Sequence, residues 1–176
     1  MKKTLFYIFF LLLGYFNLYS QPVILDVSHT DVSCNGGKDG TITVTIEGGT
    51  DPYYYYINAG GLVYSSPQTS DTIYTFTNIE ARNWVIIIED ANENYAASSQ
   101  LVTQPDPISI ISESFIQISC NGFNDGQINV SATGESDSYI YTLDPVGTIS
   151  YDGNFNGLGP GTYRVLVEDS TGCSTT

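Results

Sequence analysis

Basic side chains are scarce in this sequence. Its 176 residues include 5 Lys and Arg against 19 Asp and Glu, which gives a formal net charge of -14. Surfaces that bind nucleic acid need clustered Lys and Arg to neutralise phosphates. The composition therefore disfavours nucleic acid as a partner.

Histidine and cysteine are also rare, with His29 as the one imidazole and three thiols in the whole chain. Catalytic sites with a nucleophile and a general base, and zinc sites, usually need histidine or cysteine, which this chain has in very small number. The acids lie mostly beside turn glycines and prolines, where they serve turn geometry and solubility rather than a glycosidase-like carboxylate pair. We therefore expect no enzyme. Disorder is disfavoured because 41% hydrophobic and 13% aromatic residues suffice to build cores.

Residues 1–20 have the pattern of a signal peptide. Lys2 and Lys3 give a positive start and residues 5–13 form an unbroken apolar run. This run is short for a membrane span, which needs roughly 20 residues, so the alternative of a retained anchor helix is less favoured. We expect cleavage after Ser20 and a secreted or outer-surface protein that has no membrane span after cleavage.

The rest of the chain contains an internal repeat. Residues 34–42 (CNGGKDGTI) align with residues 120–128 (CNGFNDGQI) at an offset of 86, and residues 84–90 (WVIIIED) align with residues 163–169 (YRVLVED) at an offset of 79. The second copy is thus seven residues shorter, and the change in length lies between the two aligned blocks. Surface connections tolerate such changes.

Apolar residues alternate with polar ones in each copy, as in residues 41–46 and 127–132, and no helical stripe is present after the signal. Glycine-rich turns separate the alternating segments. Such short strands bury their apolar faces best as two packed antiparallel sheets. We predict an all-β chain of two tandem Ig-like β-sandwich domains, residues 22–105 and 106–176, with residues 103–107 as a proline-stiffened linker. Residues 158–163 (LGPGTY) predict a corner closed by the tyrosine.

The combination of Cys-Asn-Gly, Asp-Gly, Leu-x-Pro-Gly-Thr-Tyr, Val-x-Val-x-Asp and Gly-Cys resembles the SprB repeat of Bacteroidetes secreted and cell-surface proteins. That family takes its name from a gliding-motility adhesin. The second copy carries the pattern almost completely, whereas the first has Glu93 and Asn94 where Gly172 and Cys173 stand in the second. The resemblance implies architecture and location rather than an active site.

Alignment with the first copy places Thr176 opposite Ala97, so the second copy lacks most of its last strand. We expect a fragment of a longer gene product or a truncated reading frame.

In an exported member of this family, Cys120 and Cys173 are expected to form a disulfide within the second copy. Cys34 is then the free thiol, because Asn94 occupies its partner position. We interpret Cys34 as an idle or buried cysteine of a degenerate repeat. The alternative is an intermolecular disulfide or a reactive thiol.

No cofactor is expected, and calcium is the one ion that the acids invite. Residues 90–94 (DANEN) imitate the opening of an EF-hand loop, but Tyr95 replaces its glycine and Leu101 its last glutamate. Weak candidate ligands for a site elsewhere are Asp39, Asp90 and Asp125. A solvated acidic surface is the favoured interpretation.

Four consecutive tyrosines, residues 53–56, suggest stacking against sugar rings. In a strand two of them point inward, and Tyr53 and Tyr55 match Tyr139 and Tyr141 of the second copy. Tyr54 and Tyr56 are therefore the candidate ligand pair, although packing between side chains is favoured.

The leading hypothesis is a non-catalytic secreted or cell-surface repeat protein that serves as an adhesion and spacer module. The alternative is a carbohydrate-binding accessory module of a larger secreted enzyme. Surface glycans or another extracellular ligand would be the partner.

Overall fold

A computed structural model describes residues 20–176 of the chain, so the predicted signal peptide lies outside the described residues except for Ser20. All regular structure in this part of the chain is β. The fourteen strands are β1 (Val23–Thr30), β2 (Gly40–Glu47), β3 (Tyr54–Ala59), β4 (Leu62–Ser65), β5 (Ile73–Ile79), β6 (Asn83–Glu89), β7 (Tyr95–Leu101), β8 (Ser109–Ile116), β9 (Gly126–Thr133), β10 (Tyr139–Asp144), β11 (Thr148–Ser150), β12 (Asn154–Leu158), β13 (Arg164–Asp169) and β14 (Ser174–Thr175).

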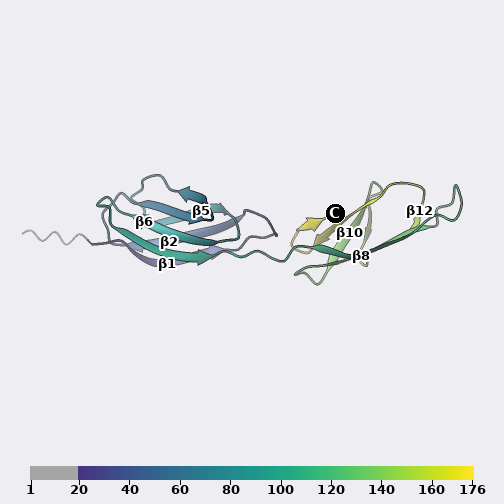
Figure 1. Cartoon of the computed structure of the whole chain (residues 1–176), viewed down its shortest axis with the longest axis horizontal. Coiled ribbons are helices and arrows are strands. Elements are labelled where there is room, and N and C mark those ends of the chain that lie inside the picture. The colour runs from purple at the N-terminus through teal and green to yellow at the C-terminus, as the bar shows by residue number, and fades with distance from the viewer. Residues whose placement is uncertain (1–19) are drawn as a thin grey trace, which may run out of the picture. The chain divides into compact units, whose positions relative to one another are not determined.

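The strands form two pairs of sheets with the same order in each pair. The first seven strands give the sheets β1-β2-β5 and β4-β3-β6-β7, and the next seven give β8-β9-β12 and β11-β10-β13-β14. The strand pairs whose register is known are antiparallel. Each set of seven is an Ig-like sandwich, as Figure 1 shows for the labelled strands. The predicted fold class is confirmed; the domain limits at residues 105 and 106 stay a prediction.

The first core follows the alternation seen in the sequence. On β2 the side chains of Ile42, Val44 and Ile46 are buried while the threonines between them are half-buried. The matching face of β6 buries Trp84, Ile86 and Ile88 completely. These two faces come from different sheets, so they form the inside of the sandwich.

The second core is smaller. It contains five buried side chains, namely Val130, Tyr141, Leu143, Phe155 and Val167. Tyr163 donates a hydrogen bond from its hydroxyl to the carbonyl of Gly159 at 3.0 Å, which confirms the predicted corner. β14 has two residues, whereas its counterpart β7 has seven.

Candidate functional site

The Cys34 loop, residues 31–39, connects β1 to β2. The Asp39 carboxylate accepts a hydrogen bond from the Ser33 amide at 3.0 Å, and the Cys34 carbonyl accepts one from Gly37 at 2.9 Å. The hydrogen bonds from Ser33 hold the pKa of Asp39 below its ordinary value. Gly40 ends the loop where an added Cβ would lie 2.8 Å from the Ile79 carbonyl. The Asp39-Gly40 pair therefore ends the loop close to β5 (Ile73–Ile79), the strand beside β2 in the sheet.

The Cys120 loop, residues 117–125, repeats this structure between β8 and β9. The Asp125 carboxylate accepts from the Ser119 amide at 3.0 Å, and the Cys120 carbonyl accepts from Phe123 at 3.1 Å. The pKa of Asp125 is lowered by these hydrogen bonds from Ser119. A Cβ at Gly126 would again lie 2.8 Å from a carbonyl, that of Leu158. The sequence repeat thus encodes one loop geometry twice.

A second repeated element is the turn after β6 and after β13. In the Cys173 turn, residues 169–173, the Asp169 carboxylate accepts from the Thr171 amide at 2.9 Å and from the Cys173 amide at 3.0 Å. Gly172 takes a positive φ of 90° there. The hydroxyl of Thr171 is the main cause that lowers the pKa of Asp169, against a smaller opposing effect of burial. The carboxylate therefore fixes the backbone that presents Cys173.

The matched turn of the first copy keeps this geometry without glycine or cysteine. The Asp90 carboxylate accepts from the amides of Asn92 and Asn94, each at 2.9 Å, and Glu93 takes a positive φ of 63°. The departure from the family pattern at residues 93 and 94 therefore removes the thiol but not the turn.

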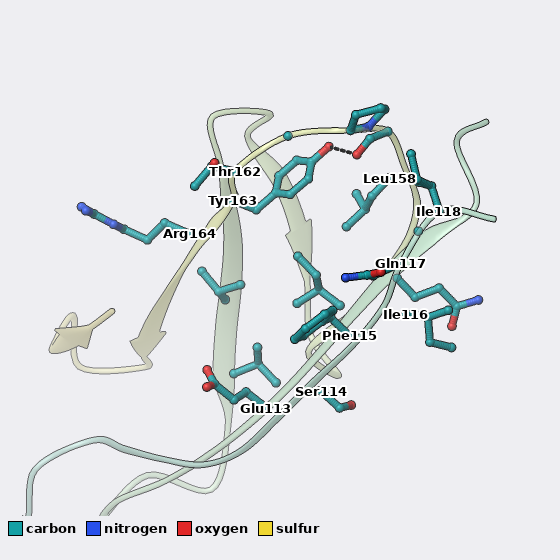
Figure 2. Close-up of a pocket in the computed structure, with 18 of the residues that line it drawn as sticks. Glu113, Ser114, Phe115, Ile116, Gln117, Ile118, Leu158, Thr162, Tyr163 and Arg164 are labelled. Atoms are coloured by element: carbon teal, nitrogen blue, oxygen red, sulfur yellow. Dashed lines mark hydrogen bonds between the residues drawn. The ribbon is translucent and has the colours of Figure 1, made fainter. Parts of the chain in front are cut away.

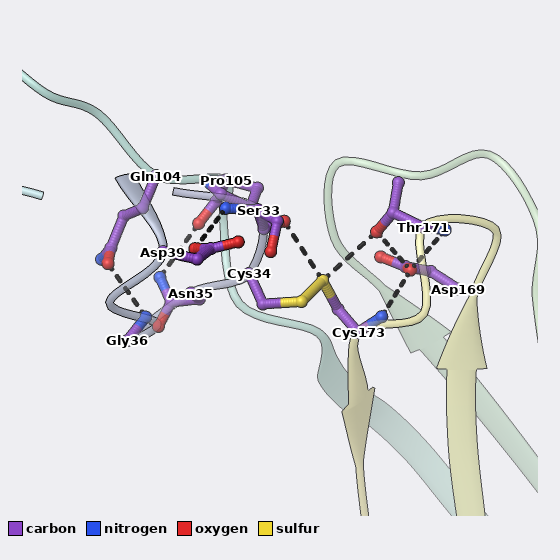
Figure 3. Close-up of a disulfide and its surroundings, with 10 residues drawn as sticks. All are labelled: Ser33, Cys34, Asn35, Gly36, Asp39, Gln104, Pro105, Asp169, Thr171 and Cys173. Carbon is purple, nitrogen blue, oxygen red and sulfur yellow. Dashed lines mark hydrogen bonds between the residues drawn. A yellow bond between two sulfur atoms is a disulfide. The ribbon is translucent and has the colours of Figure 1, made fainter. Parts of the chain in front are cut away.

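Cys34 and Cys173 form the disulfide that Figure 3 shows. The two residues are 139 apart in sequence, and their Cα atoms are 5.5 Å apart. Both belong to one compact unit, which includes His29–Thr41 and Leu101–Thr176. Cys120 is exposed and free. The predicted bond between Cys120 and Cys173, with Cys34 as the free thiol, is therefore wrong.

The strand directions explain this correction. Cys120 follows the Ile116 end of β8, whereas Cys173 follows Asp169, which pairs with Tyr139 near the opposite end of the second sandwich. An eight-residue strand separates these ends by about 25 Å. A disulfide requires Cα atoms within about 7 Å, so the two cysteines cannot meet.

The Cys34 loop is also attached to the segment that follows β7. Asn35 donates from its side chain to the Pro105 carbonyl at 3.0 Å, and the Gly36 amide donates to the Gln104 side chain at 2.9 Å. Figure 3 shows both contacts beside the disulfide. The Thr103 amide also donates to the Asp31 carboxylate at 2.7 Å, so hydrogen bonds and one covalent bond together hold the loop, a role that the cysteine count alone did not indicate.

The candidate calcium ligands each serve their own loop. Asp39 and Asp125 close the two cysteine loops, and Asp90 is buried with backbone amides on its carboxylate. Between Ser20 and Thr176 no three or more His, Cys, Asp or Glu side chains gather in a way that could hold a metal ion. In residues 90–94 the Asp90 carboxylate accepts from the turn amides, and the Asn92 and Asn94 side chains donate hydrogen bonds, so the likeness to an EF-hand opening reflects a hydrogen-bonded turn.

Tyr54 and Tyr56 lie on the outer face of β3, where both are half-buried and their rings stack with centroids 6.0 Å apart. Tyr53 and Tyr55 are buried, which confirms that this pair faces the core. Two aromatic rings inclined at 23° are therefore partly accessible on this face of β3.

Two solved structures are similar to the chain at low sequence identity. A structure of the fibronectin(III)-like modules of Clostridium thermocellum CbhA is 15% identical, with 88% of this chain and 89% of that chain covered and a TM-score of 0.34. The central fibronectin-III array of RIM-binding protein is also 15% identical, with 93% and 69% covered and a TM-score of 0.28. No curated protein matches the chain. The family model of the SprB repeat matches residues 27–62 and 112–148. The chain therefore carries two copies of the SprB repeat, as the resemblance of the motifs predicts.

Proposed function

We propose that the chain is a non-catalytic spacer and adhesion module of a secreted or cell-surface protein. Two SprB repeats support a repeat module of adhesin type. The proposed export rests on the signal pattern of residues 1–20. No helix between Ser20 and Thr176 is long and apolar enough to cross a membrane.

The disulfide is the observation that carries the spacer function. A spacer on a cell surface must keep its length when its ends are pulled apart. Force applied to the two ends of this chain passes from Cys34 directly to Cys173, so the 139 residues of separation between them cannot be drawn out while the bond is intact. The bond makes most of two sandwiches inextensible even if they unfold.

Single-molecule stretching between residue 21 and residue 176 tests this role. The oxidised chain is expected to lengthen only by residues outside the cross-link, whereas the reduced chain gains up to about 490 Å from its 139 residues. Cys34→Ser serves as a control that behaves as reduced under oxidising conditions. Equal extension of the oxidised and reduced chains would refute the spacer function.

A second candidate function rests on the stacked pair Tyr54 and Tyr56. Flat aromatic faces suit sugar rings, so the chain would then be a carbohydrate-binding accessory module. Glycan-array binding should be lost in Tyr54→Ala/Tyr56→Ala and kept in Tyr95→Ala, whose side chain is 72% exposed on another strand. Attachment to surfaces or cells without dependence on sugar would favour the adhesion function instead.

A further inference from the structure

The Cys120 loop has the same internal hydrogen bonds as the Cys34 loop. Among the described residues it lacks the disulfide and the hydrogen bonds by which the Cys34 loop is attached to other segments. The groups that anchor the first loop are the Cys34 sulfur, the Asn35 side chain and the Gly36 amide. Their counterparts are Cys120, Asn121 and Gly122. Within residues 20–176 Cys120 is free, and the other two have no such hydrogen bond. One of the two equivalent loops therefore lacks these three contacts among the described residues.

A groove of about 880 Å³ lies next to the Cys120 loop. Figure 2 shows the Phe115 ring pointing into it, with Tyr163 and Leu158 along its upper side. Its wall includes Ile128, Leu158 and Val165, which are only partly buried. Their matches in the first copy, Ile42, Ile79 and Ile86, are fully buried. The groove is thus an unfilled part of the second core.

In the first copy this space is filled by the chain that continues from β7. Val102 is 1% exposed, and its amide donates to the Arg82 carbonyl at 2.9 Å. The Val102 side chain also reaches Gly40, at 3.2 Å from an added Cβ. In the second copy β14 pairs only with Val167 and Glu168, so the same edge of β13 from Arg164 to Leu166 has no strand beside it among the described residues.

We propose that this end of the second sandwich is an acceptor site for a further SprB repeat, whose Gly-Cys turn forms a disulfide with Cys120. The segment leading into that repeat would pair with β13 as β7 pairs with β6, and would bury an apolar side chain in the groove as Val102 is buried in the first copy. Its linker would then meet Asn121 and Gly122 as Gln104 and Pro105 meet the Cys34 loop. The first two repeats provide the template for each of these contacts.

The shape and chemistry of the groove suit an extended, partly apolar strand better than a helix or a small molecule. One wall is an open sheet edge, which offers backbone donors and acceptors in the spacing that only another strand satisfies. The Phe115 ring on β8 is 71% exposed and lines the groove, so it supplies apolar area that such a strand would cover.

The bond would form by thiol-disulfide exchange with a small-molecule disulfide such as glutathione disulfide. The Cys120 thiolate attacks one glutathione sulfur and releases the other glutathione as a thiolate. The cysteine of the Gly-Cys turn, after losing its proton, then attacks the Cys120 sulfur and releases the second glutathione. Two protein thiols are oxidised and one glutathione disulfide is reduced to two thiols.

The test is a chain in which a second copy of residues 98–176 follows Thr176, since Thr176 aligns with Ala97. This extension supplies a complete last strand, the linker and another Gly-Cys turn. After equilibration in a glutathione buffer, alkylation and peptide mapping should find Cys120 bonded to the added copy of Cys173. The one free thiol should be the added copy of Cys120. In the unextended chain Cys120 should be the thiol that is alkylated.

A positional control moves the added cysteine by three residues, with Cys173→Ser and Ser170→Cys in the extension only. Cys120 should then remain free. Cys120 that is alkylated in the extended chain as in the native one, or that bonds equally to the displaced cysteine, would overturn the proposal. The proposed disulfide of Cys120 goes beyond the proposed spacer and adhesion function. Thiol mapping involves neither force nor a ligand, so either proposal can fail while the other holds.

A measurement on the native chain does not depend on folding of the extension. A peptide of residues 95–107 added in excess should slow amide exchange at Leu166 and the residues just before it, and a peptide of the same composition in scrambled order should not. Equal exchange with both peptides would contradict the strand-accepting groove.

Discussion

Trp84→Ala is expected to lower the free energy of unfolding of the first repeat by about 3–5 kcal/mol. Trp84 is fully buried on β6, and its ring meets Tyr64 edge-on at a centroid distance of 5.5 Å. The substitution removes the largest buried side chain of this sandwich and leaves a cavity between two sheets. Such a cavity costs both the transfer energy and the lost contacts.

Val85→Ala is the matched control, because Val85 is next on the same strand and 41% exposed. It should change stability by no more than about 0.5 kcal/mol. Trp84→Tyr introduces the residue that the second copy has at Tyr163 and should give an intermediate loss.

Urea unfolding followed by circular dichroism measures the loss, and hydrogen exchange assigns it to a repeat. Amides of β6 should exchange faster in Trp84→Ala while those of β13 are unchanged. A Trp84→Ala chain as stable as Val85→Ala would contradict the described core.

The period-two alternation predicted the strands of both cores because each buried position on β2 and β6 follows a polar or outward one. The glycine turns predicted where strands end, and Tyr163 predicted the corner. These features depend on neighbours in sequence or on one local hydrogen bond. For this reason they could be found without a structure.

The cysteine pairing failed because it depends on the direction of strands far apart in sequence. Membership of the same copy predicts a bond between Cys120 and Cys173. In a sandwich whose strands alternate in direction, the loop after the first strand and the turn after the sixth lie at opposite ends. Counting the strands between the two cysteines is therefore enough to exclude the bond.

The same count indicates the partner that was missed. The seventh strand leaves a sandwich at the end where the first loop lies, so the linker passes Cys34, as the contacts of Gln104 and Pro105 with that loop show. The absence of a Gly-Cys turn in the first copy was a further signal. With one such turn and two loop cysteines, one loop cysteine has to stay unpaired within this chain.

Asp90→Ala is expected to destabilise the first repeat by about 3 kcal/mol at neutral pH. The Asp90 carboxylate is buried and accepts from the amides of Thr50, Asn92 and Asn94 at 2.9–3.1 Å. Its removal leaves several amides of the turn without an acceptor. Asp90→Asn should cost nearly as much, because its amide nitrogen would face other donors.

Asp26→Asn is the control for charge, since Asp26 is exposed on β1 and the change removes one negative charge from the same sandwich. Its effect should stay within about 0.5 kcal/mol. Urea unfolding at neutral pH compares the variants, and equal stability of Asp90→Ala and Asp26→Asn would refute the role of the carboxylate in the turn.

The effect of Asp90 on the free energy of unfolding is expected to depend on pH. Burial acts to raise the pKa of Asp90, but hydrogen bonds from Asn94, Asn92 and Thr50 together outweigh it and leave the pKa below its ordinary value of 3.8. A group whose pKa is lower in the folded state contributes stability above the unfolded pKa, and this contribution is lost as the pH falls through the folded pKa. The native chain should therefore lose stability below about pH 4, and Asp90→Ala should lose less over the same interval. The difference between the two chains should narrow in acid, whereas a gap that widens would show that the carboxylate is held in its neutral form.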